Sequence, residues 1–275
     1  MVVRVVQISD THLSGGKQHF APNWQPLVAW VRAQSPDLII HSGDVTVDGA
    51  DVEEDMTFCA AALPALGAPV LCVPGNHDVG EAKSPHQLVN AERIARWRRH
   101  FGPDYWAHDI PGWRFCGLDS LLLGSGDPEE ERQFSWLERA LAGAEGRRVA
   151  WFLHQPLFLE DPAEGDTGYW GVKPAPRARL LDLARRHGVA LIASGHLHKS
   201  HDRHLDGIRV IWAPSAAFVV GPELQPEMPG EKRLGAVLYE FRPDGFSGAI
   251  HEIDALRPFR IDDVLHEVYP PRHAA

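Results

Sequence analysis

The stretch VVRVVQISDTH, residues 2–12, sets the pattern that organises the chain. Its Val and Ile residues do not alternate with polar ones, which is typical of a strand buried on both faces of a sheet. The run ends at Asp10 and His12, two residue types that bind metal ions. If further strands end in the same way, an open α/β sheet gathers such groups at the carboxyl edge of its strands.

Five more apolar runs follow, namely DLIIHSG (37–43), APVLCVPG (68–75), WRFCGLDS (113–120), RRVAWFLH (147–154) and VALIASGH (189–196). Helical patterns lie between them at residues 24–34, 51–66, 85–101, 129–142 and 176–187. Pro64 should end or kink the second helix, and Gly188 is a plausible stop for the last. Alternating strands and helices predict an α/β architecture.

The C-terminal part has a different pattern. IRVIWAPS (208–215), LGAVLYEF (234–241) and FSGAIHEI (246–253), with the turn RPDG between the last two, predict antiparallel strands over about 208–253. The stretch 160–176, rich in Gly, Pro and Asp, predicts a long loop, and long loops in compact domains tend to be functional. No repeat or linker divides the chain, so we expect one domain over residues 1–275.

Composition narrows the class of partner. The formal charge of −10 argues against a general nucleic-acid surface, which needs clustered Lys and Arg. The densest basic cluster would spread around a helix, so we expect it to form a solvated face. It consists of Arg93, Arg96, Arg98 and Arg99. A small anionic substrate is still compatible, because a local positive charge such as bound metal overrides the global field.

No feature of the sequence predicts a membrane protein. The first apolar run lacks a basic leader and a cleavage site, and no run reaches the ~20 residues that span a bilayer. Cys59, Cys72 and Cys116 form no CxxC pair and lie in or near apolar runs, which predicts buried, inert thiols in a reducing compartment. We therefore expect a cytoplasmic protein without a membrane partner.

Five of the six runs end in metal-ligand types. These are Asp10 and His12, Asp44, Asn76, His154, and His196 with His198. Two carboxylates, one amide and four imidazoles are too many for one tetrahedral zinc site, but they suit two metals if one carboxylate bridges. Two carboxylates ~4 Å apart repel by about 4 kcal/mol at an effective dielectric of ~20, and bound cations reverse the sign.

The order DTH (10–12), GD (43–44), GNHD (75–78), a lone histidine and GHLH (195–198) resembles that of the calcineurin-like metallophosphoesterase superfamily. The resemblance implies a four-layer α/β/β/α sandwich with mixed sheets. It assigns Asp10, His12 and His198 to one metal ion, Asn76, His154 and His196 to the other, and Asp44 to both. It places His77 beside the substrate phosphate as general acid or charge stabiliser. The metals are Fe, Mn, Zn, Co or Ni, which such mixed ligands all accept.

Several further residues are candidate substrate contacts. Asn76 and His77 lie in the GNHD motif, Tyr169 and Trp170 lie in the long loop, and His201 follows GHLH. Asp48 is a candidate for orienting His77, as an Asp after the GD motif does in related phosphatases. Here it comes four residues after Asp44, whereas in many relatives it comes three residues after that aspartate.

The stretch after the GD motif bears on the substrate. Ser/Thr protein phosphatases carry an Arg there that grips a dianionic monoester, whereas GDVTVDGADVEE (43–54) has none. The chain is most similar to class III cyclic-nucleotide phosphodiesterases and glycerophosphodiesterase-type relatives. We therefore expect a metal-bridging hydroxide to attack a small phosphodiester.

Alternatives to this expectation are a phosphomonoesterase or nuclease of the same superfamily and, more remotely, a non-catalytic protein-binding scaffold. The C-terminal strands and the tail HEVYPPRHAA (266–275) are candidate contacts for a homodimer.

Overall fold

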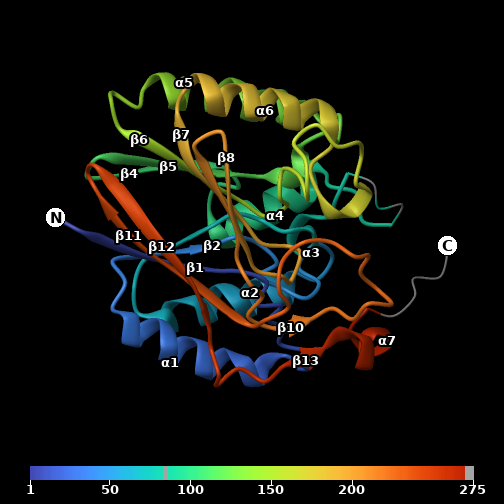
Figure 1. Cartoon of the computed structure of the whole chain (residues 1–275). Coiled ribbons are helices and arrows are strands. Elements are labelled where there is room, and N and C mark those ends of the chain that lie inside the picture. Colours follow the sequence, from blue (N-terminus) through green and yellow to red (C-terminus); the bar gives the residue numbers. More distant parts are fainter. Residues whose placement is uncertain (83, 85, 270–275) are drawn as a thin grey trace.

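The computed structural model describes residues 1–82, 84 and 86–269. Four layers succeed one another, helices, sheet, sheet and helices, as Figure 1 shows from bottom to top. This arrangement confirms the predicted α/β/β/α sandwich with mixed sheets.

The first sheet has the order β12-β11-β1-β2-β3 and the second the order β4-β5-β6-β7-β9-β8. The strands of the first are β1 (Val3–Ile8), β2 (Leu38–His41), β3 (Val70–Cys72), β11 (Gly235–Arg242) and β12 (Gly245–Glu252). The strands of the second are β4 (Trp106–Ile110), β5 (Trp113–Leu118), β6 (Arg148–Leu153), β7 (Val189–Ser194), β8 (His201–Leu205) and β9 (Ile208–Trp212). A small third sheet pairs β10 (Phe218–Val219) with β13 (Phe259–Arg260).

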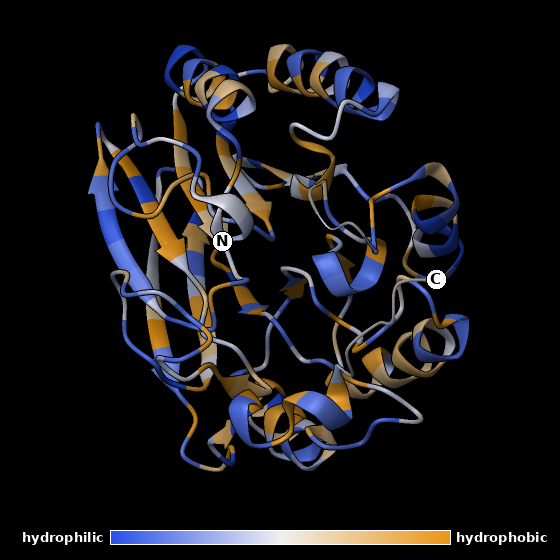
Figure 2. Ribbon diagram, turned by 90° about the vertical axis from the view of Figure 1, so that its right-hand side faces the viewer, coloured by the Kyte–Doolittle hydropathy of each residue, from blue (hydrophilic) through white to orange (hydrophobic). Residues whose placement is uncertain are grey.

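Helices cover the outer face of each large sheet. α1 (Trp24–Gln34), α2 (Glu53–Ala62) and α4 (Ala91–Phe101) pack on the first sheet, and α5 (Pro128–Ala142) and α6 (Pro174–Arg186) on the second. The short helices α3 (Asn76–Val79) and α7 (Leu265–Val268) lie at the strand ends. The outer helices carry both hydrophilic and hydrophobic residues in Figure 2, as expected where one face meets a sheet and the other meets water.

The packing of β1 explains its unbroken apolar run. Val3 and Val5 enter the core between the two sheets, whereas Val6 and Ile8 enter the core between the first sheet and its helices. Successive side chains point to opposite faces, so a strand with helices on one side and a sheet on the other is apolar at both. Arg4 is only partly buried, whereas Gln7 is fully buried and its side-chain amide donates to Ser42 Oγ at 2.9 Å.

All six apolar runs form strands, and α1 has the predicted bounds. α2 ends at Ala62, and a 3-10 turn that contains Pro64 follows it. The helix predicted from residue 85 begins only at Ala91, because Asn90 caps it by accepting a hydrogen bond from the backbone of Arg93 at 3.0 Å. Residue 85 itself lies outside the described residues.

The prediction for the C-terminal strands was only partly correct. β11 and β12 pair antiparallel, and β11 joins β1 antiparallel, as expected. β9, however, lies parallel to β7 in the second sheet and antiparallel to the unpredicted strand β8. The short β4 was also missed.

Two expectations from composition can be compared with the structure. Cys59, Cys72 and Cys116 are free and buried, and burial raises the pKa of each thiol. Within residues 1–82, 84 and 86–269, none of the helices has both the length and the apolar character that a bilayer span requires.

Candidate metal centre

The seven predicted ligand residues meet where β1, β2, β3, β6 and β7 end. We call this set the metal floor: Asp10, His12, Asp44, Asn76, His154, His196 and His198. All seven are buried, with relative exposures of 5% or less. Asp44 lies between two groups, because its Oδ2 is 3.7 Å from His12 Nε2 and 3.3 Å from His154 Nε2.

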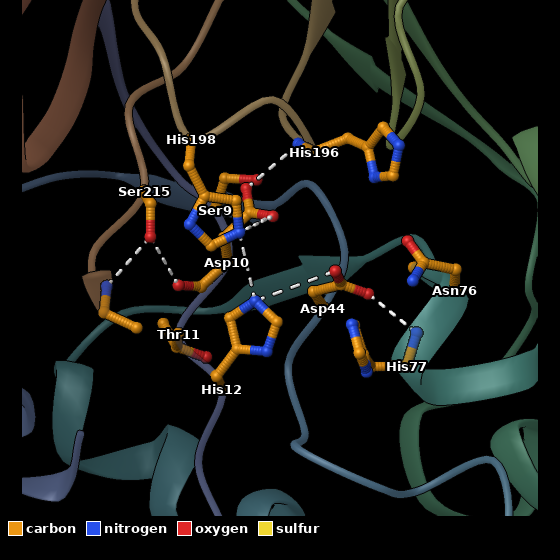
Figure 3. A network of polar contacts seen from close by, with 12 residues as sticks. Ser9, Asp10, Thr11, His12, Asp44, Asn76, His77, His196, His198 and Ser215 are labelled. Carbon is orange, nitrogen blue, oxygen red and sulfur yellow. Dashed lines mark hydrogen bonds and ion pairs between the residues drawn. The ribbon is translucent and has the colours of Figure 1, made fainter. Parts of the chain in front are cut away.

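The first group consists of Asp10, His12 and His198. Asp10 Oδ1 is 3.4 Å from His198 Nε2, and the Nε2 atoms of His12 and His198 are 3.3 Å apart. In Figure 3 these three side chains and that of Asp44 point toward one common centre. The ligand atoms of Asp10, His12 and His198 lie within 4.8 Å of one another.

The second group consists of Asn76, His154 and His196. His154 Nε2 is 3.1 Å from Asn76 Oδ1 and 3.1 Å from His196 Nδ1. Ligand atoms of His154, His196 and Asp44 also lie within 4.8 Å of one another. The two groups therefore share the Asp44 carboxylate, as the resemblance implied.

The buried atoms of the floor fit two cations. Asp10 Oδ1 is buried and has no hydrogen-bond partner among the described residues. The facing ring nitrogens of His12 and His198 can share only one proton, and the same holds for His154 and His196. A cation accepts lone pairs from all of these atoms at once, so the donor set suits metal ions better than a network of hydrogen bonds.

Backbone carbonyls select the ring nitrogen that faces the centre. The nitrogen remote from the centre donates from His154 to Ser42 at 2.8 Å, from His198 to Phe218 at 2.8 Å and from His196 to Tyr169 at 2.9 Å. A carbonyl can only accept, so each bond holds the proton on the remote nitrogen. The other nitrogen keeps its lone pair for a metal ion.

The backbone of the floor is strained. Five of its residues have left-handed backbones: Asp10 (φ 52°), His12 (φ 42°), Asp44 (φ 51°), His196 (φ 70°) and His198 (φ 50°). Non-glycine residues adopt this conformation rarely and at a cost, and such residues cluster at functional sites.

Glycines next to the ligands allow close approach. A Cβ on Gly75 would lie 2.2 Å from the backbone nitrogen of Asp44, and one on Gly195 would lie 1.9 Å from Ser9 Oγ. The sequence analysis did not identify this role of Gly75. Its signal is the glycine directly before the ligand in the GD, GN and GH pairs.

One protonated histidine offsets part of the negative charge of the floor. Burial lowers the pKa of His154, but the neighbouring Asp44 carboxylate outweighs it and the pKa rises to about 9. Burial and the His154 charge lower the pKa of His196 to about 3. Burial alone would raise the pKa of Asp10, yet His198 holds it below its usual range. The metal-free floor therefore holds a proton on His154 at neutral pH.

His77 lies at the edge of the floor. Its backbone N–H donates to Asp44 Oδ1 at 2.9 Å, and its ring Nδ1 donates to the carbonyl of Val47 at 3.1 Å. The Asp48 carboxylate is paired with Lys17, and the carbonyl of Val47, one residue earlier, contacts the His77 ring. The orienting role of Asp48 stays a prediction.

A cavity of about 340 Å³ opens beside the floor, lined in part by His77, His196, His198, Tyr169 and Tyr269. We call its remaining lining the apolar wall: Trp170, Phe218, Val220, Leu224, Ile261 and Leu265. Within residues 1–82, 84 and 86–269, no Lys or Arg lines this cavity. Tyr169 and Trp170 thus lie where substrate contacts were predicted, and the amide nitrogen of Asn76 donates to Tyr169 Oη at 3.2 Å.

His201 does not line this cavity. It begins β8, its ring packs against Trp212 at 4.8 Å, and it borders a different hollow with Asp202 and Arg233. The structure therefore places His201 away from the metal floor, and its contact with substrate stays a prediction. Conversely, sequence reasoning missed Phe218, Leu265 and Tyr269, because they lie beyond the motifs and carry no pattern that marks a site.

Comparisons with known proteins agree with this geometry. The family description "Calcineurin-like phosphoesterase" matches residues 3–200. A Synechococcus protein named "Probable cyclic nucleotide phosphodiesterase" is 28% identical over 92% of this chain and 94% of its own. The Escherichia coli "3',5'-cyclic adenosine monophosphate phosphodiesterase CpdA" is 28% identical over 80% of this chain and 78% of its own. The Arcobacter nitrofigilis "Probable glycerophosphodiester phosphodiesterase GpdQ" is 28% identical over 82% and 83%.

Solved structures show the same fold. Purple acid phosphatase from yellow lupin superposes with a TM-score of 0.68 over 96% of this chain and 55% of its own, at 14% identity. With the family match covering residues 3–200, the conclusion is direct. The chain belongs to the calcineurin-like phosphoesterase family and is a metal-dependent hydrolase of phosphoesters.

Proposed function

We propose that the protein is a dinuclear phosphodiesterase that hydrolyses small diesters carrying an apolar or aromatic group, with cyclic nucleotides as the favoured class. One observation carries the proposal. Two trios of ligands that share the Asp44 carboxylate lie beside a cavity that His196 and His198 border and that the apolar wall lines on its other side.

Two metal ions, when bound, supply a nucleophile by lowering the pKa of a shared water and neutralise charge on the phosphate. The protein's own part is positional. Asp44 Oδ2 lies between the two trios, 3.7 Å from His12 Nε2 and 3.3 Å from His154 Nε2. Asp44 Oδ1 accepts a hydrogen bond from the backbone N–H of His77. Because Nδ1 of His77 donates to the carbonyl of Val47, Nε2 carries a proton only when the ring is an imidazolium, and in that form it donates to the departing oxygen.

The charge of the cavity favours a diester. A monoester dianion needs more positive charge than a monoanionic diester, and neither Lys nor Arg is found among the described residues that line the cavity. The apolar wall suits the flat face of an aromatic substituent such as a nucleobase, against which apolar and aromatic side chains pack. It offers little to the hydroxyls of glycerol. The names of the relatives from Synechococcus and Escherichia coli support the same class.

The test combines metal analysis with a substrate panel. We expect two equivalents of metal per chain after loading with Mn²⁺, and a higher kcat/KM for bis(p-nitrophenyl) phosphate than for p-nitrophenyl phosphate. We expect 3',5'-cyclic AMP to be a better substrate than glycerophosphocholine. Preference for the monoester would support a phosphatase, and salt-dependent cleavage of single-stranded DNA a nuclease. Failure to bind metal would support the alternative of a non-catalytic protein-binding scaffold.

The homodimer stays a prediction, and residues 270–275 of its proposed contact lie outside the described residues.

A further inference from the structure

One imidazole of the metal floor is held differently from the other three. The remote nitrogens of His154, His196 and His198 each face a backbone carbonyl. The remote nitrogen of His12, Nδ1, faces the phenol oxygen of Tyr269 at 3.0 Å. The Tyr269 side chain therefore contacts the remote nitrogen of His12, as backbone carbonyls contact the remote nitrogens of the other three histidines.

Tyr269 ends a C-terminal segment, residues 261–269, that lies against the cavity. The segment contains a 3-10 turn (Ile261–Asp263) and α7, and in Figure 1 it lies beside β10 and β13. Two contacts hold its end. Lys17 Nζ donates to the carbonyl of Val268 and to the Asp48 carboxylate, and His19 Nε2 is 3.0 Å from the carboxylate of Glu267. The segment lies beyond residue 200, where the family match ends.

The hydrogen bond between Tyr269 and His12 is compatible with metal binding by His12 in one direction only. If Tyr269 donated its proton to Nδ1, the proton of a neutral His12 would sit on Nε2, which points into the floor. If the phenol oxygen accepts, Nδ1 carries the proton and Nε2 keeps its lone pair. Metal binding by His12 therefore requires the phenol to accept, and its oxygen then fixes the ring as a carbonyl would.

The ring of Tyr269 also meets His77. The two rings stack with centroids 4.5 Å apart and planes 28° apart, and the His12 and His77 centroids are 5.0 Å apart. One side chain thus contacts both a floor ligand and the group proposed to face the departing oxygen. It also closes one side of the cavity.

We propose that Tyr269 is a positioning residue for the metal centre, and that the Lys17 contact with Val268 keeps it in place. The inference rests on the proposed function, because it assumes that His12 binds a cation. Tyr269 sets the tautomer and the ring direction of His12 through its hydroxyl, and it supports the ring of His77 through its aromatic face.

Tyr269→Phe tests the hydroxyl while keeping the stack on His77. Metal-free protein is titrated with Mn²⁺ or Co²⁺ by calorimetry, and the Co²⁺ absorption spectrum reports on coordination. We expect one of the two sites to bind about 10- to 100-fold more weakly, which is the usual effect of losing an outer hydrogen bond to a ligand, and the other to be unchanged. kcat at subsaturating metal should fall, with KM for the diester nearly constant. Tyr105→Phe, remote from the floor, is the matched control and should behave as the wild type.

Lys17→Met tests the contact that holds the segment, with the exposed Lys232→Met as its control. We expect a weakening of the same metal site as in Tyr269→Phe. If Tyr269→Phe unfolds in a thermal melt, the Lys17→Met titration decides the question instead.

The outcomes separate the two proposals. A wild-type protein that takes up no pair of metal ions contradicts the proposed function. A wild-type protein that binds two, beside Tyr269→Phe and Lys17→Met variants with unchanged affinities and Co²⁺ spectra, overturns the role of Tyr269 alone.

Discussion

The metal floor and the apolar wall border the same cavity but differ in origin. The floor comes from five strand ends, is buried, and holds five of its seven residues in left-handed conformations. The wall comes from the loop before α6, from the chain around β10 and from the C-terminal segment. The difference indicates that the floor supplies the chemistry shared by the family, whereas the wall decides which ester fits. Changes in the floor should act on kcat and metal content, and changes in the wall on the discrimination between substrates.

The largest expected effect comes from Asp44→Asn, which removes charge from the atom shared by both trios. We expect kcat to fall by on the order of 10³-fold, or about 4 kcal/mol in transition-state stabilisation, because both metals lose a ligand. Elemental analysis should show less than two equivalents bound. Asp182→Asn, on the exposed face of α6, is the control. An Asp44→Asn enzyme that keeps both metals and a tenth of the wild-type kcat would break the assignment of the bridge.

A second expected effect is a pH dependence of metal binding that arises from a titrating group of the metal floor. In the metal-free protein the pKa of His154 is about 9, so a cation must displace one proton at pH 7. Metal affinity should rise about tenfold per pH unit from pH 7, or about 100-fold in total, and level off above pH 9. Calorimetry in buffers of different ionisation enthalpy should detect about one proton released at pH 7. Affinity that stays flat between pH 7 and 9 would show that His154 is neutral in the metal-free state.

Gly75→Ala tests the close packing of the floor. The added methyl group would lie 2.2 Å from the backbone nitrogen of Asp44, so the chain must move to admit it. We expect unfolding to cost about 1–3 kcal/mol less than in the wild type, with weaker metal binding. Chemical denaturation measures the first and metal titration the second. Gly245→Ala adds a methyl group where no atom lies within 4 Å and should change neither. Equal stability of the two variants would contradict the tight floor.

The smallest expected effect comes from the wall. Leu265→Ala enlarges the cavity without touching the floor ligands, so metal content should not change. We expect kcat/KM for bis(p-nitrophenyl) phosphate to fall about tenfold, and that for the smaller methyl p-nitrophenyl phosphate to fall less, because a lost apolar contact costs about 1–3 kcal/mol. Equal losses on both substrates would show that the wall does not select the ester.

The floor could be predicted from the sequence because its signal is local. Each ligand comes directly after an apolar run, and parallel strands bring such ends together. The alternation of strands and helices predicted an α/β architecture, whereas the four layers were implied by the resemblance to the metallophosphoesterase superfamily. The contact of His77 with the Val47 carbonyl could not be predicted, because any residue type offers a backbone carbonyl. The place of His201 could not be predicted either, because it lies on an unpredicted strand and its ring packs against Trp212.

The wall and Tyr269 could not be predicted, because their contact with the floor is long-range. Tyr269 meets His12 across 257 residues, and no motif or period marks it. Leu265 and Ile261 are ordinary apolar residues whose importance comes only from the place where the C-terminal segment docks. That placement depends on Lys17 and on β13, which pairs with β10 through two residues of each strand.

The most direct test of the central claim is anomalous diffraction from crystals of the Mn²⁺-loaded protein, measured above and below the manganese edge. The account predicts two peaks about 3.5–4 Å apart with the Asp44 carboxylate between them, one beside Asp10, His12 and His198 and the other beside Asn76, His154 and His196. A single peak, or peaks remote from Asp44, would contradict it.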